Sequence, residues 1–196
     1  MNYLGHIYFS NNDFELAIAN LFGDYVKGAH FDQYSQKIVD GIILHREIDN
    51  YIDTHPSVKN ILPTLRISLP KVAGIAIDLY FDHLLAKNWN QFHTTPLNEF
   101  LQSFYNQIQE NKQIYPAFYL DYLQKMIEYN WMSHYSSTEG LNKMCNGVSQ
   151  KLSFKNQLVN GLQVFNMHET LIEKAFFEYM SDANEHFVHY FSRNMS

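Results

Sequence analysis

The chain has 196 residues, long enough to bury a sizeable core, and 46% of them are hydrophobic, with 14 Tyr and 15 Phe. A net charge of −6 argues against bulk nucleic-acid binding, and the single cysteine, Cys145, excludes an internal disulfide framework or a thiolate metal cluster. No apolar run approaches the roughly 18 residues of a membrane span, and the N-terminus lacks the features of a signal peptide. We expect one domain over residues 1–196, in the cytoplasm and without a membrane partner, and we make no prediction of its oligomeric state.

Apolar residues recur every three to four positions, and this spacing predicts an all-α, single-domain helical bundle. In chain order, the first expected helix is capped by Asn12 or Asp13 and runs up to Gly28. A second helix should cover residues 34–54 and end before Pro56, which a short helix should follow.

The pattern continues through the second half of the chain. A long helix, rich in Ala, Ile and Leu, is expected over residues 70–90. Pro96 and Pro116 stand at first-turn positions of further helices. Two or three helices should fill residues 139–196, the last of them over residues 167–191.

Two pairs of metal-capable side chains lie four residues apart in these predicted helices, His45 with Asp49 and Asp78 with Asp82. Side chains at i and i+4 share a helix face, so each pair can reach one point in space. For the first pair alone, a His–Asp hydrogen bond on a half-buried face is the commoner explanation. The second pair lies in an almost wholly apolar segment, where two unpaired carboxylates would be costly, so a divalent cation is favoured there. His83 adjoins this pair and could reach the edge of the same cavity.

Other polar residues carry a weaker signal. Asp24, after Gly23, and His6, near the N-terminus, would each be structural or surface residues if taken alone. Acidic and histidine side chains crowd the last predicted helix at Asp182, Glu185, His186 and His189. A solvated helix face explains that crowding better than a functional site does.

Five motifs follow one another along the first 90 residues: Met1-Asn2-Tyr3-Leu4-x-His6, Gly23-Asp24-Tyr25-Val26-Lys27-Gly28, Gly41-x-x-x-His45-Arg46-x-x-Asp49, Asp78-x-x-x-Asp82-His83, and Trp89. Together they resemble the acyl carrier protein phosphodiesterase family. The second half matches only at Trp131-x-x-x-Tyr135 and Asn146-Gly147. The family usually has Arg where this chain has Lys27, a change that keeps the charge but loses the bidentate fork.

The resemblance implies a helical hydrolase related to the HD-domain phosphohydrolases, which bind a divalent cation through His and Asp side chains. The family activity removes the 4′-phosphopantetheine group from holo-acyl carrier protein, giving the apo protein and free 4′-phosphopantetheine, and belongs to fatty acid biosynthesis and lipid metabolism. The implied cation is Mn²⁺, with Mg²⁺ or Fe²⁺ as alternatives. Nitrogen and carboxylate ligands without thiolate suit these ions.

The resemblance also implies roles for individual residues. The expected metal ligands are His6, Asp24, His45, Asp49 and Asp82. Lys27 and Arg46 are expected to bind the phosphate, and Arg46 to assist catalysis. His83 is the candidate general acid for the departing serine oxygen, and Asp78 the candidate to orient it or a metal ligand.

The implied partner is acidic, as acyl carrier proteins are, so docking on this acidic chain must use local basic surface. An acid-free window at residues 54–77 carries Lys59, Arg66 and Lys71, which we expect to dock the carrier protein. A second acid-free window, residues 140–168, carries three further lysines: Lys143, Lys151 and Lys155.

Two other functions stay open at this point. One is a metal-dependent phosphohydrolase of the same helical class that acts on a nucleotide or another small phosphoester. The other is a non-catalytic helical module whose carboxylate cluster binds a metal for structure alone. Turnover of small diesters without turnover of holo-carrier protein would favour the first, and metal-dependent stability without any phosphoester turnover would favour the second.

Overall fold

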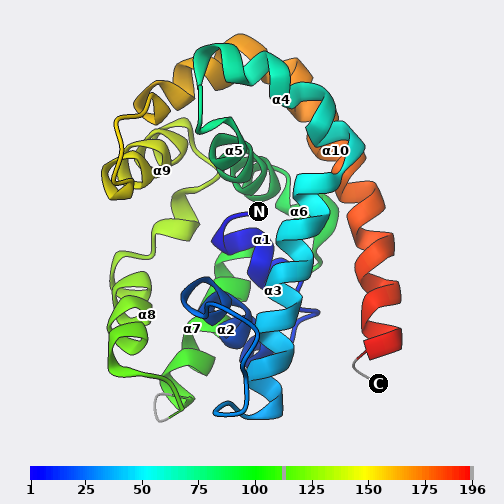
Figure 1. The fold of residues 1–196 in the computed structure, drawn as a ribbon, viewed down its shortest axis with the longest axis vertical. Helices are drawn as coiled ribbons and strands as arrows, with labels where there is room; N and C mark the ends of the chain where they lie inside the picture. Colours follow the sequence, from blue (N-terminus) through cyan, green and yellow to red (C-terminus); the bar gives the residue numbers. More distant parts are fainter. Residues whose placement is uncertain (112–113, 195–196) are drawn as a thin grey trace.

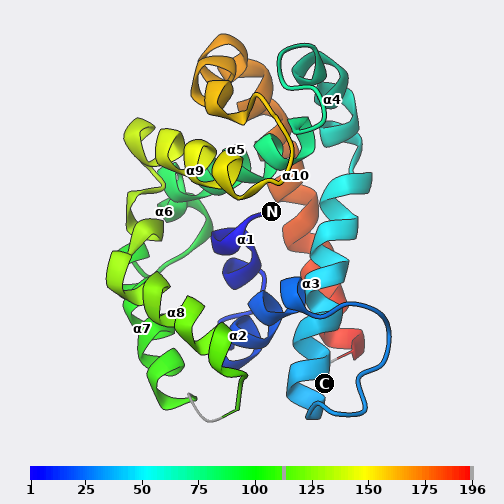
Figure 2. The same ribbon diagram turned by 60° about the vertical axis from the view of Figure 1, so that its left-hand side comes forward.

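A computed structural model describes residues 1–111 and 114–194, and all regular secondary structure in this part is helical (Figures 1 and 2). The α-helices are α1 (Tyr3–Tyr8), α2 (Phe14–Phe22), α3 (Gln36–Thr54), α4 (Pro56–Ser68), α5 (Ala73–Lys87), α6 (Trp89–Phe92), α7 (Leu97–Glu110), α8 (Ala117–Tyr129), α9 (Thr138–Lys151) and α10 (Gly161–Asn194). Short 3₁₀ helices are η1 (Gly23–Tyr25), η2 (Trp131–His134) and η3 (Leu158–Asn160). The predicted all-α class is confirmed, and no helix in the described part is long and apolar enough to cross a membrane.

The helix boundaries follow the predicted caps closely at most ends. The Asp13 carboxylate accepts a hydrogen bond from the backbone N–H of Leu16 at 2.9 Å and so caps α2. Pro56 opens α4, which has 13 residues and is longer than the short helix expected there. The predicted helix up to Gly28 is wrong in its second half, because the chain leaves α2 after Phe22 and turns into η1.

Helix α1 lies in the middle of the molecule, surrounded by α2, α3 and α5 (Figures 1 and 2). Helices α2 and α3 pack unusually closely beside it because α3 carries Gly41 at the crossing. A Cβ atom on Gly41 would lie 2.3 Å from the Cβ of Ala19 and 2.7 Å from the backbone N of Asn20. Only glycine therefore allows the two backbones to touch, and this contact brings α2 and α3 to the same side of α1.

Helix α5 is buried along most of its length, between α1, α9 and α10. Its Tyr80 hydroxyl donates a 2.7 Å hydrogen bond to the carbonyl of Gly161, where α10 begins. Helix α10 begins at Gly161, before the start predicted at residue 167, and it kinks at His168. Helix α5 also packs on α1, and its Asp78 and Asp82 side chains lie at the N-terminal end of α1.

Candidate metal centre

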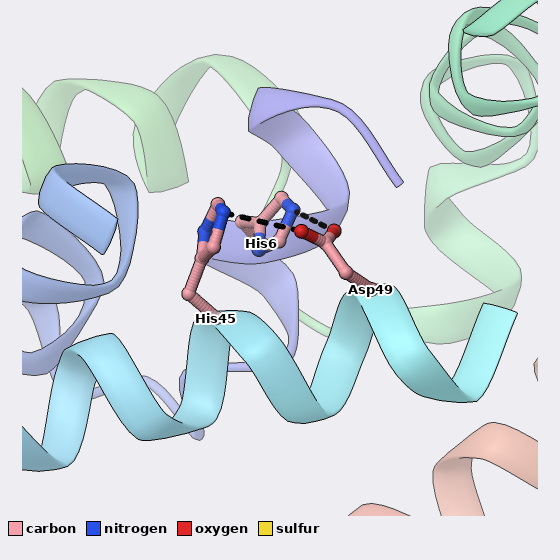
Figure 3. A group of neighbouring side chains, drawn as sticks. All are labelled: His6, His45 and Asp49. Carbon is pink, nitrogen blue, oxygen red and sulfur yellow. Dashed lines mark ion pairs between the residues drawn. The ribbon is translucent and has the colours of Figure 1, made fainter. Parts of the chain in front are cut away.

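Three potential metal ligands meet between α1 and α3 (Figure 3). His45 and Asp49 come from consecutive turns of α3, and His6 comes from α1. One carboxylate oxygen of Asp49 lies 3.2 Å from Nε2 of His6, and the other lies 3.2 Å from Nε2 of His45. The two imidazole rings stack with centroids 4.3 Å apart, and the three potential ligand atoms lie within 4.8 Å of one another. The predicted i, i+4 pair on α3 thus faces a third ligand from a different helix.

Asp24 joins this cluster from η1. One of its carboxylate oxygens lies 3.3 Å from Nε2 of His45, and its side chain is 58% exposed. The approach depends on Gly23, since a Cβ atom there would lie 2.6 Å from both Cβ and Cγ of His45. The early end of α2 and the glycine that follows it therefore place Asp24 next to the two histidines.

A buried amide fixes which nitrogen of His6 faces the cluster. The Asn20 side chain donates from Nδ2 to the carbonyl of His6 and to the hydroxyl of Ser10, both at 3.1 Å. Its oxygen must then accept, and it lies 2.9 Å from Nδ1 of His6. Nδ1 of His6 consequently carries the proton, and Nε2 keeps a lone pair toward Asp49, as a metal-ligating histidine requires.

The two histidines differ in protonation. Burial lowers the pKa of His6, and the nearby Asp49 carboxylate, which favours the charged imidazole, offsets only part of that effect. Burial also lowers the pKa of His45, but hydrogen bonds to Asp24 and Asp49 outweigh it and raise the pKa to about 9. The same contacts hold the pKa of both carboxyls below the ordinary range despite burial. Without a metal, the two carboxylates beside Nε2 of His45 therefore favour the cationic form of this imidazole.

The cluster forms one wall of an acidic cavity of about 280 Å³. Four carboxylates line this cavity: Asp24, Asp49, Asp53 and Asp78. Among the described residues of this cavity, the terminal ammonium of Met1 is cationic, and it donates a 2.9 Å hydrogen bond to Asp78. An anionic ligand would be repelled here unless cations offset the carboxylate charge. A divalent cation suits both the donor set and the charge of this site.

Asp82, a predicted metal ligand, has a different position and role. It is fully buried, and its two oxygens accept hydrogen bonds from the backbone N–H groups of Asn2 (3.2 Å), Leu4 (2.7 Å) and Gly5 (3.0 Å). It therefore caps the N-terminus of α1, in place of the Asn2 side chain, which makes no capping hydrogen bond. Burial raises the pKa of Asp82 to about 7, against the lowering effect of the Met1 ammonium and the backbone donors. The carboxylate holds the helix that carries His6 and lies outside the ligand cluster.

His83, the predicted general acid, does not line the acidic cavity. Its Nδ1 donates a 2.6 Å hydrogen bond to the carbonyl of Tyr135, and its ring lies edge-on to Phe165. Adjacent helix positions point about 100° apart, so His83 faces η2 and α10 while Asp82 faces α1. Asp78 does line the cavity, but its hydrogen bond goes to the Met1 ammonium and not to His83.

Of the two predicted phosphate-binding cations, Lys27 lies on the loop that follows η1, and Arg46 reaches this loop from α3. The Arg46 guanidinium donates to the carbonyls of Val26 (3.2 Å) and Gly28 (2.6 Å) and lies over the ring of Phe31. Arg46 therefore orders this loop. The Lys27 ammonium donates to the Asp24 carbonyl at 3.1 Å and is exposed.

Sequence reasoning missed Asn20 and Asp53, and it quoted Gly41 as part of a motif without its role at the crossing of α2 and α3. Asn20 is the one polar residue in the apolar run Leu16–Phe22 of α2, and a polar group in such a run must find a hydrogen-bond partner. That signal marks Asn20 as a structural or positioning residue, although it does not name His6 as the partner.

The fold and the cluster define an all-helical protein with a candidate divalent-metal centre made of histidine and aspartate. The family model for acyl carrier protein phosphodiesterase matches residues 1–183. The chain belongs to the acyl carrier protein phosphodiesterase family.

Curated relatives agree with this assignment. The acyl carrier protein phosphodiesterases of Enterobacter sp. (strain 638) and Klebsiella pneumoniae (strain 342) are 26% and 27% identical over 180 residues, covering 91% of this chain and 93% of each relative. That of Photorhabdus laumondii is 26% identical and covers 91% of both chains. No solved structure matches the chain.

Proposed function

We propose that this protein is a metal-dependent phosphodiesterase that hydrolyses holo-acyl carrier protein. Water attacks the phosphorus, the bond from phosphorus to the carrier serine oxygen breaks, and a proton ends on that oxygen. The products are apo-acyl carrier protein and 4′-phosphopantetheine. The observation that carries the proposal is the His6–His45–Asp49 cluster on an acidic cavity, in a chain of this family.

His6, His45 and Asp49 are the proposed ligands, with Asp24 as the fourth. The Nε2 lone pair of His6 and the carboxylates on either side of His45 suit a divalent cation. Mn²⁺ is our choice, because nitrogen ligands favour it over Mg²⁺, and Fe²⁺ is the alternative. When bound, the cation supplies charge for the phosphate and lowers the pKa of a water. The protein's own part is to hold these ligands and to present Lys27, on the ordered loop, to the phosphate.

A residue of the acidic cavity is better placed than His83, which does not line it, to donate the proton to the serine oxygen. Asp53 lines the same cavity as the cluster, and burial and the charge of Asp78 raise its pKa. We propose Asp53 as the general acid. Asp53→Asn should slow hydrolysis when the leaving group is a serine alkoxide but not when it is p-nitrophenolate, which needs no proton. Equal slowing of both substrates would contradict this role.

The acidic carrier protein is proposed to dock on α4 and the turn after it. Lys59, Arg66 and Lys71 are exposed there, and Ile67, next to Arg66, is 83% exposed. An exposed apolar side chain among cations suits an acidic partner. Reversal of the three charges should weaken turnover of the carrier protein more than turnover of a small diester, and an equal loss with both would exclude this surface.

The experiment that tests the function measures Mn²⁺-dependent loss of phosphopantetheine from holo-carrier protein. His45→Ala and Asp49→Ala should abolish it. His186→Ala is the matched control, because His186 also pairs with a carboxylate, Glu47, at 2.9 Å, but outside the cluster. Full activity of the cluster variants would contradict the proposal.

The wider assignment follows from the same proposal. The chain would act as one domain over residues 1–196. It would meet its substrate in the cytoplasm and take part in lipid metabolism. We also propose kinship with the HD-domain phosphohydrolases, which use His and Asp ligands on helices.

A further inference from the structure

A second cavity, of about 380 Å³, opens next to the acidic one. It lies between the start of α1, η2 and α9, and its walls are largely aromatic and aliphatic: Tyr3, Trp131, Tyr135, Met144 and Val148. We call this cavity the α9 groove. Its character differs sharply from that of its neighbour, since none of its lining residues is acidic and two of them are lysines, Lys143 and Lys151.

The two cavities adjoin each other. Asn2, Tyr3 and Val148 line both of them. The Tyr3 ring contacts the ring of Trp131, which lines the second cavity, with centroids 6.4 Å apart. A molecule whose phosphate lies at the metal cluster can therefore extend directly into the α9 groove.

We propose that the α9 groove binds the pantetheine arm of the substrate, an inference that rests on the proposed function. The arm carries a geminal dimethyl group, two amides and a thiol, so beyond its phosphate it is neutral and largely apolar. It suits aromatic and aliphatic walls with a single amide side chain, that of Asn2, at the entrance. The carrier protein itself is a folded domain and cannot enter the groove, so the serine side of the phosphodiester faces outward and the arm faces inward.

One glycine gives a selective way to block the groove. Gly147 lies on α9 and lines the groove, and a Cβ atom added there would meet no heavy atom within 4 Å. Gly147→Leu therefore fills groove space without a clash in the fold. Gly74 on α5 is the matched control, because it is also an exposed helical glycine with open space at Cβ but lines neither cavity.

The first test compares kcat/KM for holo-carrier protein with kcat/KM for bis(p-nitrophenyl) phosphate. Gly147→Leu should lower the ratio of the two at least tenfold, mainly through KM for the carrier protein, and Gly74→Leu should keep the wild-type ratio. A wild-type ratio in Gly147→Leu would overturn the proposal.

The second test uses binding alone, so it does not depend on turnover. The chain has two tryptophans, and Trp131 lines the groove while Trp89 is 3% exposed beside His93 and Phe100. Titration with pantetheine should change tryptophan fluorescence saturably, with at least tenfold weaker binding to Gly147→Leu than to Gly74→Leu. If AMP binds in this way and pantetheine does not, the groove serves another substrate and the proposal is wrong. Pantetheine binding without any release of phosphopantetheine from carrier protein would leave the groove assignment standing and refute the proposed function.

Discussion

Replacement of Asn20 by alanine should weaken metal binding without touching a ligand. Asn20 is fully buried, and its amide makes three hydrogen bonds, one of them to Nδ1 of His6. The His6 carbonyl keeps a partner, because the Ser10 hydroxyl donates to it at 2.8 Å. The imidazole N–H is left buried and unpaired, at a cost of about 1–3 kcal/mol, and the other two bonds are worth about 1 kcal/mol each. We therefore expect the free energy of unfolding to fall by about 3–5 kcal/mol in total.

The metal affinity should fall about 10- to 100-fold, as is typical when the outer partner of a ligating histidine is lost. Isothermal titration with Mn²⁺ measures this change, and urea unfolding measures the stability. Asn20→Asp, which keeps an acceptor for Nδ1 of His6, should recover part of the affinity.

Asn156→Ala is the matched control for this experiment. Asn156 accepts from Ser149 and Leu158 and donates to two carbonyls, so its loss also costs stability, but it lies away from the cluster. Its Mn²⁺ affinity should stay at the wild-type value. If Asn20→Ala folds and binds Mn²⁺ within threefold of wild type, the reasoning about the His6 tautomer is refuted.

Three further predictions concern the same region. Asp82→Asn should lower the free energy of unfolding by about 1–3 kcal/mol, because the Leu4 N–H loses its acceptor. The number of bound Mn²⁺ ions should stay unchanged in titration, and lost binding with full stability would make Asp82 a ligand. The pKa of His45 is raised to about 9 from an ordinary 6.5, so protonated His45 stabilises the metal-free protein. This stabilisation is complete below about pH 6.5 and is lost as the pH rises to about 9. The urea midpoint should therefore fall over this range in wild type but not in His45→Gln. Gly23→Ala should displace the His45 ring and weaken Mn²⁺ binding at least tenfold by calorimetry, whereas an unchanged affinity would show that η1 adapts without moving His45.

The helices of this fold could largely be predicted because helix formation leaves local signals. Apolar spacing marks α3, Asp13 marks the start of α2, and Pro56 marks the start of α4. The end of α2 was predicted at Gly28, whereas the helix ends before Gly23. Its position depends on how closely Gly23 approaches His45 on another helix, and that contact lies 22 positions away in sequence.

The candidate site was predictable to the extent that one helix builds it. The i, i+4 spacing correctly places His45 and Asp49 on one face. The same spacing did not identify the partners of Asp78 and Asp82, because a shared helix face does not say what lies opposite. Here the backbone N–H groups at the start of α1 donate hydrogen bonds to the Asp82 carboxylate. His6 and Asp24 come from other elements, so only the resemblance to the family could indicate them.

The most direct test of the central claim is mass spectrometry of holo-acyl carrier protein after incubation with the pure protein and Mn²⁺. The proposed function predicts conversion to the apo form with release of 4′-phosphopantetheine, dependent on His45 and Asp49 and abolished by a chelator. Holo-carrier protein that stays intact after prolonged incubation with Mn²⁺ would contradict it.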